Sequence, residues 1–260
     1  MAMLELTDAQ ISTWVATLVL PLFRVVAVLM TMPILGTRML PARIRLYLGV
    51  AITIAILPSL PPLPAVNPLG LDGLLLIAEQ VIVGVMFGLS LQLLFQAFVI
   101  AGQIVAVQMG MAFASMVDPA NGVNVTVISQ FMTMLVSVLF LLMNGHLVLF
   151  EVLTESFTTL PVGQALSVTQ FWELAGRLGW VLGAGLLLIL PAITALLVVN
   201  VAFGVMTRAA PQLNIFSIGF PLTLVLGMLV FWVGLADILS HYQAVASEAL
   251  LWLRDLARAR

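Results

Sequence analysis

The sequence is divided into apolar stretches, and their lengths constrain the fold more than any other feature. A helix needs about 20 apolar residues to cross the hydrocarbon core of a membrane. Seven apolar stretches approach or exceed this length: residues 11–35, 46–60, 74–101, 102–117, 123–150, 178–206 and 213–236. None of them alternates apolar and polar residues as the strands of a membrane barrel do. We therefore expect a single all-α membrane domain, residues 1–260, with six or seven apolar helices.

A different kind of helix is expected after the last apolar stretch. Apolar residues recur there at helical spacing, namely Val245, Ala249, Trp252, Leu253 and Leu256. This spacing gives a helix one apolar and one polar face. It predicts an amphipathic helix over residues 241–260.

The charged side chains are too few for a soluble protein. Only 20 of the 260 residues are charged, and all nine basic residues are arginine, whereas a soluble domain is about 25% charged. This excludes an ordinary soluble enzyme and a disordered chain. The net charge of −2 offers no basic surface to nucleic acid. With no cysteine, two distant histidines and no catalytic motif, we expect no metal, no cofactor and no enzymatic activity.

The distribution of charges conflicts with a simple series of membrane spans. Arg38, Arg43 and Arg45 place the first loop in the cytoplasm by the positive-inside rule, but an even number of spans then puts the arginines of residues 254–260 outside. Polar side chains inside the apolar stretches are costly against lipid. We therefore expect helices that face protein, or a wet cavity, over much of their surface. Two of these residues, Arg24 and Glu79, fit either an ion path or a structural ion pair.

A stripe of small residues runs through the centre of the sequence. Gly102, Ala106, Gly110, Ala114 and Asp118 recur every four residues, so on a helix they form a narrow face that a second helix can approach closely. The other side of the segment carries Met109, Met111, Phe113 and Met116. Methionine fills irregular gaps, and an apolar constriction can block water and ions. The segment fits either a tightly packed helix pair or a flexible apolar stopper in a conduit.

A turn follows the methionine-containing segment. Asp118 and Pro119, followed by Asn121 and Gly122, are residues typical of turns. They fit either an ordinary turn or the hinge of a mobile loop.

The linker between the last two apolar stretches carries the most distinctive motif. It combines an arginine at a helix end, a proline break and polar residues, in the order Arg208, Pro211, Gln212, Asn214, Phe216 and Pro221. Residues 208–221 resemble the hallmark of the FliR family, the export-gate proteins of flagellar type III secretion, which have homologues in injectisomes. Further segments resemble the family in the same order: Gly102-Gln103, Ala114 to Pro119, Ser129-Gln130-Phe131, Gly145-His146, Pro191 and Asn200. Residues 219–223 are closer to the flagellar branch than to the injectisome branch.

The resemblance implies a core subunit of the flagellar export gate. Such subunits form a hetero-oligomeric channel with FliP and FliQ in the bacterial inner membrane, at the flagellar basal body. FlhB wraps the cytoplasmic side of the channel, FlhA is a further expected partner, and unfolded flagellar proteins pass through the centre. The resemblance also implies a fold of bent helical hairpins, in which a FliP-like part (about residues 1–175) is fused to a FliQ-like part (about residues 176–260).

The resemblance assigns a role to individual residues as well. The plug of the gate maps to Met109, Gly110, Met111, Phe113, Met116, Asp118 and Pro119. Structural or subunit-interface positions are Gly102, Ala106, Ala114, Arg208, Pro211, Gln212, Asn214, Phe216 and Pro221. A protein of another class, a multi-pass secondary transporter for a small solute, fits the helix interrupted by Pro191, although the sequence has no internal repeat.

Overall fold

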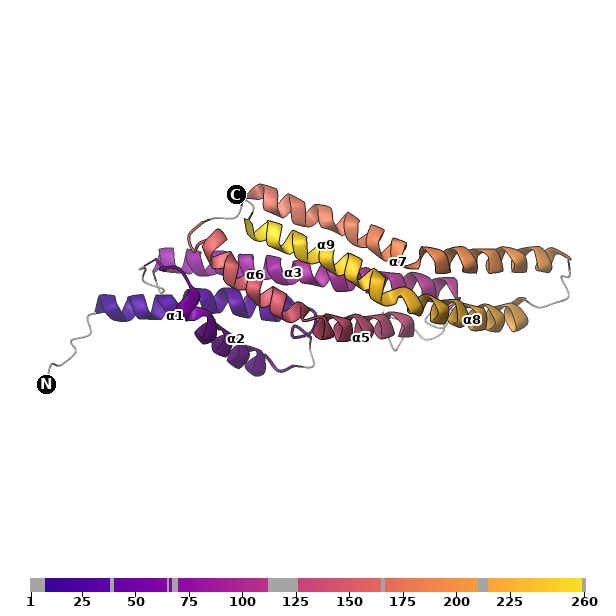
Figure 1. The fold of residues 1–260 in the computed structure, drawn as a ribbon, viewed down its shortest axis with the longest axis horizontal. Helices are drawn as coiled ribbons and strands as arrows, with labels where there is room; N and C mark the ends of the chain where they lie inside the picture. The colour runs from indigo at the N-terminus through magenta and orange to yellow at the C-terminus, as the bar shows by residue number, and fades with distance from the viewer. Residues whose placement is uncertain are drawn as a thin grey trace. The chain divides into compact units, whose positions relative to one another are not determined.

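The regular structure of the chain is helical (Figure 1). A computed structural model describes residues 8–37, 40–64, 66, 70–111, 126–164, 167–209 and 215–258, with the backbone alone for residues 8–16, 215–218 and 258. No strand occurs among these described residues. The predicted all-α fold class is therefore confirmed.

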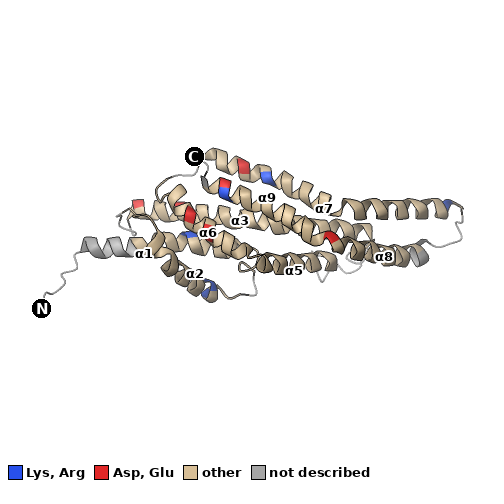
Figure 2. Ribbon diagram, viewed as in Figure 1, with Lys and Arg blue, Asp and Glu red and all other residues tan. Residues whose placement is uncertain are grey.

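The described helices follow one another along the chain. They are α1 (Asp8–Thr31), α2 (Ala42–Ile56), the 3-10 helix η1 (Leu57–Ser59), α3 (Leu71–Gln108), α5 (Val127–Leu142), α6 (Gly145–Thr159), α7 (Val168–Ala209), α8 (Ile215–Gly234), η3 (Leu235–Asp237) and α9 (Ile238–Arg258). Charged residues are sparse along all of them (Figure 2).

The chain forms two compact units. Unit 1 comprises Met1–Leu93, Asn144–Arg177 and Glu248–Arg260, and unit 2 comprises Leu94–Met143 and Leu178–Ser247. Helices α3, α7 and α9 each contribute residues to both units. Each unit is therefore held together by contacts between residues that are far apart in the sequence.

In unit 1, helix α1 packs closely against the first half of α3. A Cβ atom added at Gly84 would collide with the backbone oxygen of Arg24, and one added at Gly88 would collide with the side chain of Thr31. Only glycine at both positions allows the two backbones to approach this far. The Gly84-x-x-x-Gly88 motif is thus used for packing within the chain.

In unit 2, aromatic side chains connect the helices. The rings of Phe95 and Phe140 lie edge to face with centroids 5.6 Å apart, and those of Phe131 and Phe231 do so at 5.9 Å. The buried residues of α5 include Ile128, Met132, Val136 and Phe140, which recur every four residues and so line one face of the helix. Edge-to-face pairs of this kind stabilise a core beyond the area they bury.

The predicted amphipathic helix is present as α9. Its Trp252 and Leu256 form a buried cluster with Met86, against which Leu93 and Leu174 also pack. All five residues belong to unit 1. The apolar face that the spacing predicted is therefore covered by the chain itself.

Three boundaries differ from those expected from the sequence. The stretches at 74–101 and 102–117 are joined in one helix, α3, which ends at Gln108, because no proline or turn residue separates them. The stretch at 123–150 is broken between α5 and α6 by Asn144, whose φ of 57° is left-handed. The segment from Glu151 to Glu173, which lies between the apolar stretches at 123–150 and 178–206, is helical to Thr159 and again from Val168. Exposed glutamates within a helix, such as Glu151, explain its polar character.

In the part of the chain that the structure describes, four helical segments are long and apolar enough to cross a membrane. They are Ala42–Ser59, Leu71–Gln108, Val168–Ala209 and Gly219–Ala257, and the broken pair α5 and α6 is a fifth if it counts as one span. Only 11% of the apolar window of α7 is buried within the chain. Much of this apolar surface must therefore be covered by lipid or by other proteins.

Candidate functional site

The end of α3 fixes the start of the predicted plug segment. Gly110 has a φ of +81°, and its N–H donates to the carbonyl of Val107 at 2.9 Å, while the N–H of Met111 donates to the carbonyl of Ala106 at 3.0 Å. These two bonds form the Schellman motif, in which a glycine in the left-handed conformation ends a helix. The expected stripe from Gly102 to Asp118 is therefore not one continuous helical face, because the helix stops before it reaches Gly110.

Met109 is anchored in a notch of unit 2. Its side chain is fully buried, and it lies over Gly227 of α8. A Cβ atom added at Gly227 would lie 2.5 Å from Cγ of Met109 and 3.3 Å from Cδ2 of Leu196. The absence of a side chain at Gly227 creates the space that Met109 fills.

A polar contact holds the same end of α3. The side-chain nitrogen Nδ2 of Asn200, on α7, lies 3.4 Å from Oε1 of Gln108 and 3.5 Å from its backbone oxygen. The backbone carbonyl of Gln108 lies at the helix end, so it has no partner within the helix. We call Gln108, Met109, Asn200 and Gly227 the anchor of the predicted plug segment.

The small residues before the anchor are buried. Gly102 is packed so closely against α5 that an added Cβ would lie 2.7 Å from Cα of Ser129. The hydroxyl of Ser129 in turn donates to the carbonyl of Val99 at 3.0 Å. Ala106 is fully buried, so this face of α3 is occupied within the chain.

The remaining predicted residues fall into two groups. Outside the described residues lie Phe113, Ala114, Met116, Asp118, Pro119, Pro211, Gln212 and Asn214, and Phe216 is described by its backbone alone. Arg208, in the last turn of α7, and Pro221, inside α8, are exposed. The predicted roles of all of these residues stay predictions.

Arg24 is the centre of a polar network in the core of unit 1. Its guanidinium donates to Oε1 of Gln80 at 2.7 Å, to the backbone and side-chain oxygens of Ser156 at 3.0 Å, and to the carbonyl of Leu160 at 3.0 Å. Its Cζ atom also lies 4.2 Å from the ring centroid of Phe157. A cation at the last carbonyls of α6 is favoured by the helix dipole. Arg24 therefore holds the end of one helix, as a structural role requires.

Glu79 is less completely hydrogen-bonded than Arg24. It accepts a backbone hydrogen bond from Gly163 and is attracted electrostatically to Arg24. Its oxygen Oε1 is buried without a hydrogen-bond partner among the described residues, and so is Nε2 of the neighbouring Gln80. Arg24 thus has defined partners on α3 and at the end of α6, whereas Glu79 is only partly satisfied.

Sequence reasoning identified Met109 but not the residues that hold it. Gly227 was one of several glycines in an apolar helix, and no local pattern links it to Met109. Asn200 is one of the positions at which the sequence resembles the family, but that resemblance does not predict its contact with Gln108. These contacts join residues about 90 to 120 positions apart, a separation that periodicity does not report.

The chain is similar to known export proteins along most of its length. Residues 15–249 match the family described as bacterial export proteins, family 1. The chain is 43% identical over 227 residues to the flagellar biosynthetic protein FliR of Escherichia coli (strain K12), covering 87% of each chain. It is 37% identical over 255 residues to that of Pectobacterium carotovorum subsp. carotovorum, covering 98% of this chain and 97% of the relative. With the FliR protein of Bacillus subtilis (strain 168), identity is 26% over 237 residues.

Proposed function

This chain belongs to the bacterial export proteins of family 1, and from that premise we propose that it is a core subunit of the flagellar type III export gate. In this role it joins FliP and FliQ in a hetero-oligomeric channel of the bacterial inner membrane, at the basal body of the flagellum. FlhB and FlhA are its further partners, and unfolded flagellar proteins are the cargo. It is a transport component rather than an enzyme.

The observation that carries this proposal is the match to flagellar FliR proteins over almost the entire chain. The exposed apolar surface of α7 supports it, because a channel subunit must present such surface to its neighbours as well as to lipid. The division into a FliP-like part, about residues 1–175, and a FliQ-like part, about residues 176–260, is implied by the family resemblance and is part of the proposal.

Complementation tests the proposal. A strain of Escherichia coli that is non-motile because it lacks its own FliR should regain swimming and should secrete filament protein when it carries this chain. Restored secretion of filament protein is the direct readout, because swimming also needs a working motor. A chain that is present in the membrane but restores no secretion would contradict the proposed function.

The plug belongs to the same proposal. We assign it to Met109, Gly110, Met111, Phe113, Met116, Asp118 and Pro119, with its first residue in the anchor. The buried side chain of Met109 and the helix stop at Gly110 support a segment that is fixed at one end. An apolar seal of this kind blocks ions without a charged gate.

The alternative function, a secondary transporter for a small solute, has one supporting feature. Pro191 interrupts the hydrogen bonding of the long helix α7, as in the broken helices of transporters. The two functions differ in what purifies with the chain, because a transporter would come out of the membrane alone or with copies of itself.

A further inference from the structure

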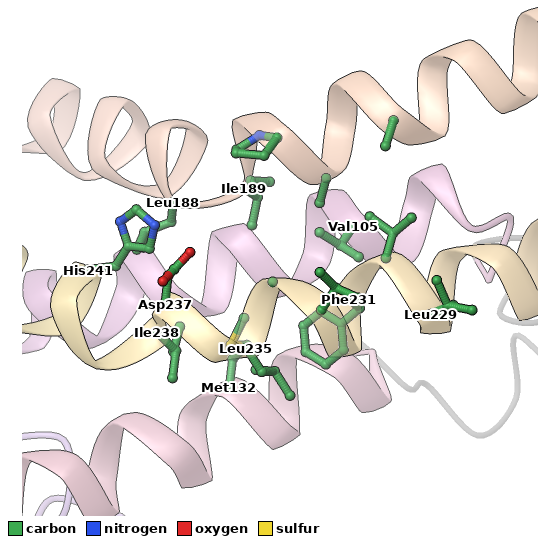
Figure 3. A pocket seen from close by; sticks show the side chains of 16 residues that line it. Val105, Met132, Leu188, Ile189, Leu229, Phe231, Leu235, Asp237, Ile238 and His241 are labelled. Atoms are coloured by element: carbon green, nitrogen blue, oxygen red, sulfur yellow. The ribbon is translucent and has the colours of Figure 1, made fainter.

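Unit 2 contains a cavity of about 430 Å³ (Figure 3). Its walls come mainly from α7 and α8, and small residues such as Ala192, Ala195 and Gly234 leave it open. Pro191 also lines it, and a proline inside a helix removes one hydrogen bond and bends the chain. The volume lies within the range of about 300 to 1,000 Å³ that is typical of small-molecule sites. The apolar walls would suit a hydrocarbon chain.

One end of the cavity is polar. Asp237 of η3 and His241 of α9 both line it (Figure 3). Asp237 is the single acidic side chain among the described residues of unit 2, and it forms no ion pair with any described residue. A carboxylate selects a cationic or hydrogen-bond-donating group.

The length of α8 indicates the depth of this carboxylate. Helix α8 has 20 residues, and at 1.5 Å per residue it is about 30 Å long, which is the thickness of the hydrocarbon core. Asp237 comes three residues after its last residue, Gly234. If α8 crosses the membrane, Asp237 lies among the lipid head groups. The cavity residues from Leu229 to Gly234 then lie just inside the hydrocarbon.

We propose that this cavity binds an acyl chain of a phospholipid whose ammonium head group pairs with Asp237. A primary ammonium is compact and has three N–H donors, so it can bond to the carboxylate while the chain fills the apolar walls. The N–H of His241 is available to a phosphate oxygen of the same lipid. The proposal concerns the membrane around the protein and does not depend on what the channel transports.

Native mass spectrometry of the purified full chain tests the proposal. Delipidated protein is equilibrated separately with dioleoyl phosphatidylethanolamine and dioleoyl phosphatidylglycerol, which differ in the ammonium group. We expect a retained adduct with the ethanolamine lipid. Asp237→Asn should weaken its binding by about threefold to fivefold, which is the worth of one partly exposed ion pair. Ala195→Phe, which fills the cavity, should abolish the adduct.

Matched controls separate this site from general lipid contact. Leu197→Phe adds the same ring on α7 at an exposed position that does not line the cavity, so the adduct should remain. Asp237→Asn alters an exposed side chain, so it decides the question even if Ala195→Phe fails to fold. Equal retention of the two lipids, with no effect of Asp237→Asn, would overturn the proposal.

A protein occupant is the remaining outcome. The chain has no cysteine, so Ala195→Cys introduces a single thiol that reports on the cavity alone. In membranes that contain the assembled complex, this thiol should react with a lipid-soluble maleimide and should not cross-link to another subunit. Efficient cross-linking to a subunit would show that a protein segment fills the cavity, and the lipid proposal would then be wrong.

Discussion

Arg24 shows at the scale of single residues how one charged side chain is accommodated in an apolar core. All of its hydrogen bonds go to oxygens on other segments, two of them backbone carbonyls near the end of α6. A planar guanidinium can reach several acceptors at fixed angles, which the single ammonium of lysine cannot do. The network therefore depends on arginine itself as well as on positive charge.

We predict that Arg24→Leu strongly destabilises the fold. Breaking a buried charge network costs about 3 to 5 kcal/mol, so the melting temperature of the purified chain should fall by roughly 10 °C. Arg24→Lys should give an intermediate value. The control is Arg208→Leu, since Arg208 is exposed and makes no ion pair with a described residue. A melting temperature of Arg24→Leu equal to that of the control would refute the structural role of Arg24.

Gly227 acts through the space it leaves. A Cβ at this position would meet Cγ of Met109 at 2.5 Å and its Cε at 3.1 Å. Gly227→Ala should therefore destabilise the protein by about 1 to 3 kcal/mol, as overpacking does. Adding Met109→Ala should recover part of that loss, giving a measurable coupling in a double-mutant cycle of melting temperatures.

The control for this cycle is Gly234→Ala at the end of the same helix. No atom lies within 4 Å of a Cβ added at Gly234, so the melting temperature should change little. Strictly additive effects of Gly227→Ala and Met109→Ala would mean that Met109 does not occupy the notch.

At the scale of helices, the sequence predicts the type of element well and its neighbours poorly. The apolar stretches identify the helices, and the spacing of Trp252 and Leu256 identifies the buried face of α9. The motifs Gly84-x-x-x-Gly88 and Gly179-x-x-x-Gly183 look alike in sequence. Yet the first is packed against α1, whereas a Cβ at either glycine of the second meets nothing within 4 Å. Local patterns thus indicate that a helix can be approached closely, but not which helix approaches it.

Neither the break between α5 and α6 nor the end of α3 before Gly110 was predicted from the sequence, and the reasons differ. The break at Asn144 has a local signal, since asparagine followed by glycine is typical of turns, but it lies inside a long apolar stretch. The end of α3 depends on Gly110, which has the left-handed conformation. The same glycine is a member of the predicted stripe of small residues. Gly110 therefore fits both a packing stripe and a helix end, and only its backbone conformation distinguishes the two.

The proposed plug makes a prediction at the same scale. Deleting residues 110–116 should raise the leakage of small ions through assembled gates, because the apolar seal is removed while the anchor stays. The leakage is measured as dissipation of the membrane potential in cells that assemble the complex. Replacing the same residues with seven glycine and serine residues keeps the chain length and should leak as well. Leakage that stays at the wild-type level in both variants would remove the plug from this segment.

At the scale of the whole molecule, the sparse charges acquire a meaning that composition alone does not provide. Two of the helical segments that could cross a membrane bury little of their surface within the chain, 11% for the window in α7 and 17% for the one in residues 219–257. The open glycines Gly179 and Gly183 leave room for another helix at close range. We infer that part of the apolar surface is an interface with other subunits rather than with lipid.

Co-purification tests the central claim, that this chain is a subunit of an export gate, most directly. The tagged chain is produced with the FliP and FliQ of its own source, extracted in mild detergent and sized as a complex. We predict that both proteins elute with it in fixed ratio, and that Arg208→Ala, at an exposed helix end, lowers their recovery without lowering the amount of the chain. A wild-type chain that elutes alone or only with copies of itself would contradict the account and favour the transporter.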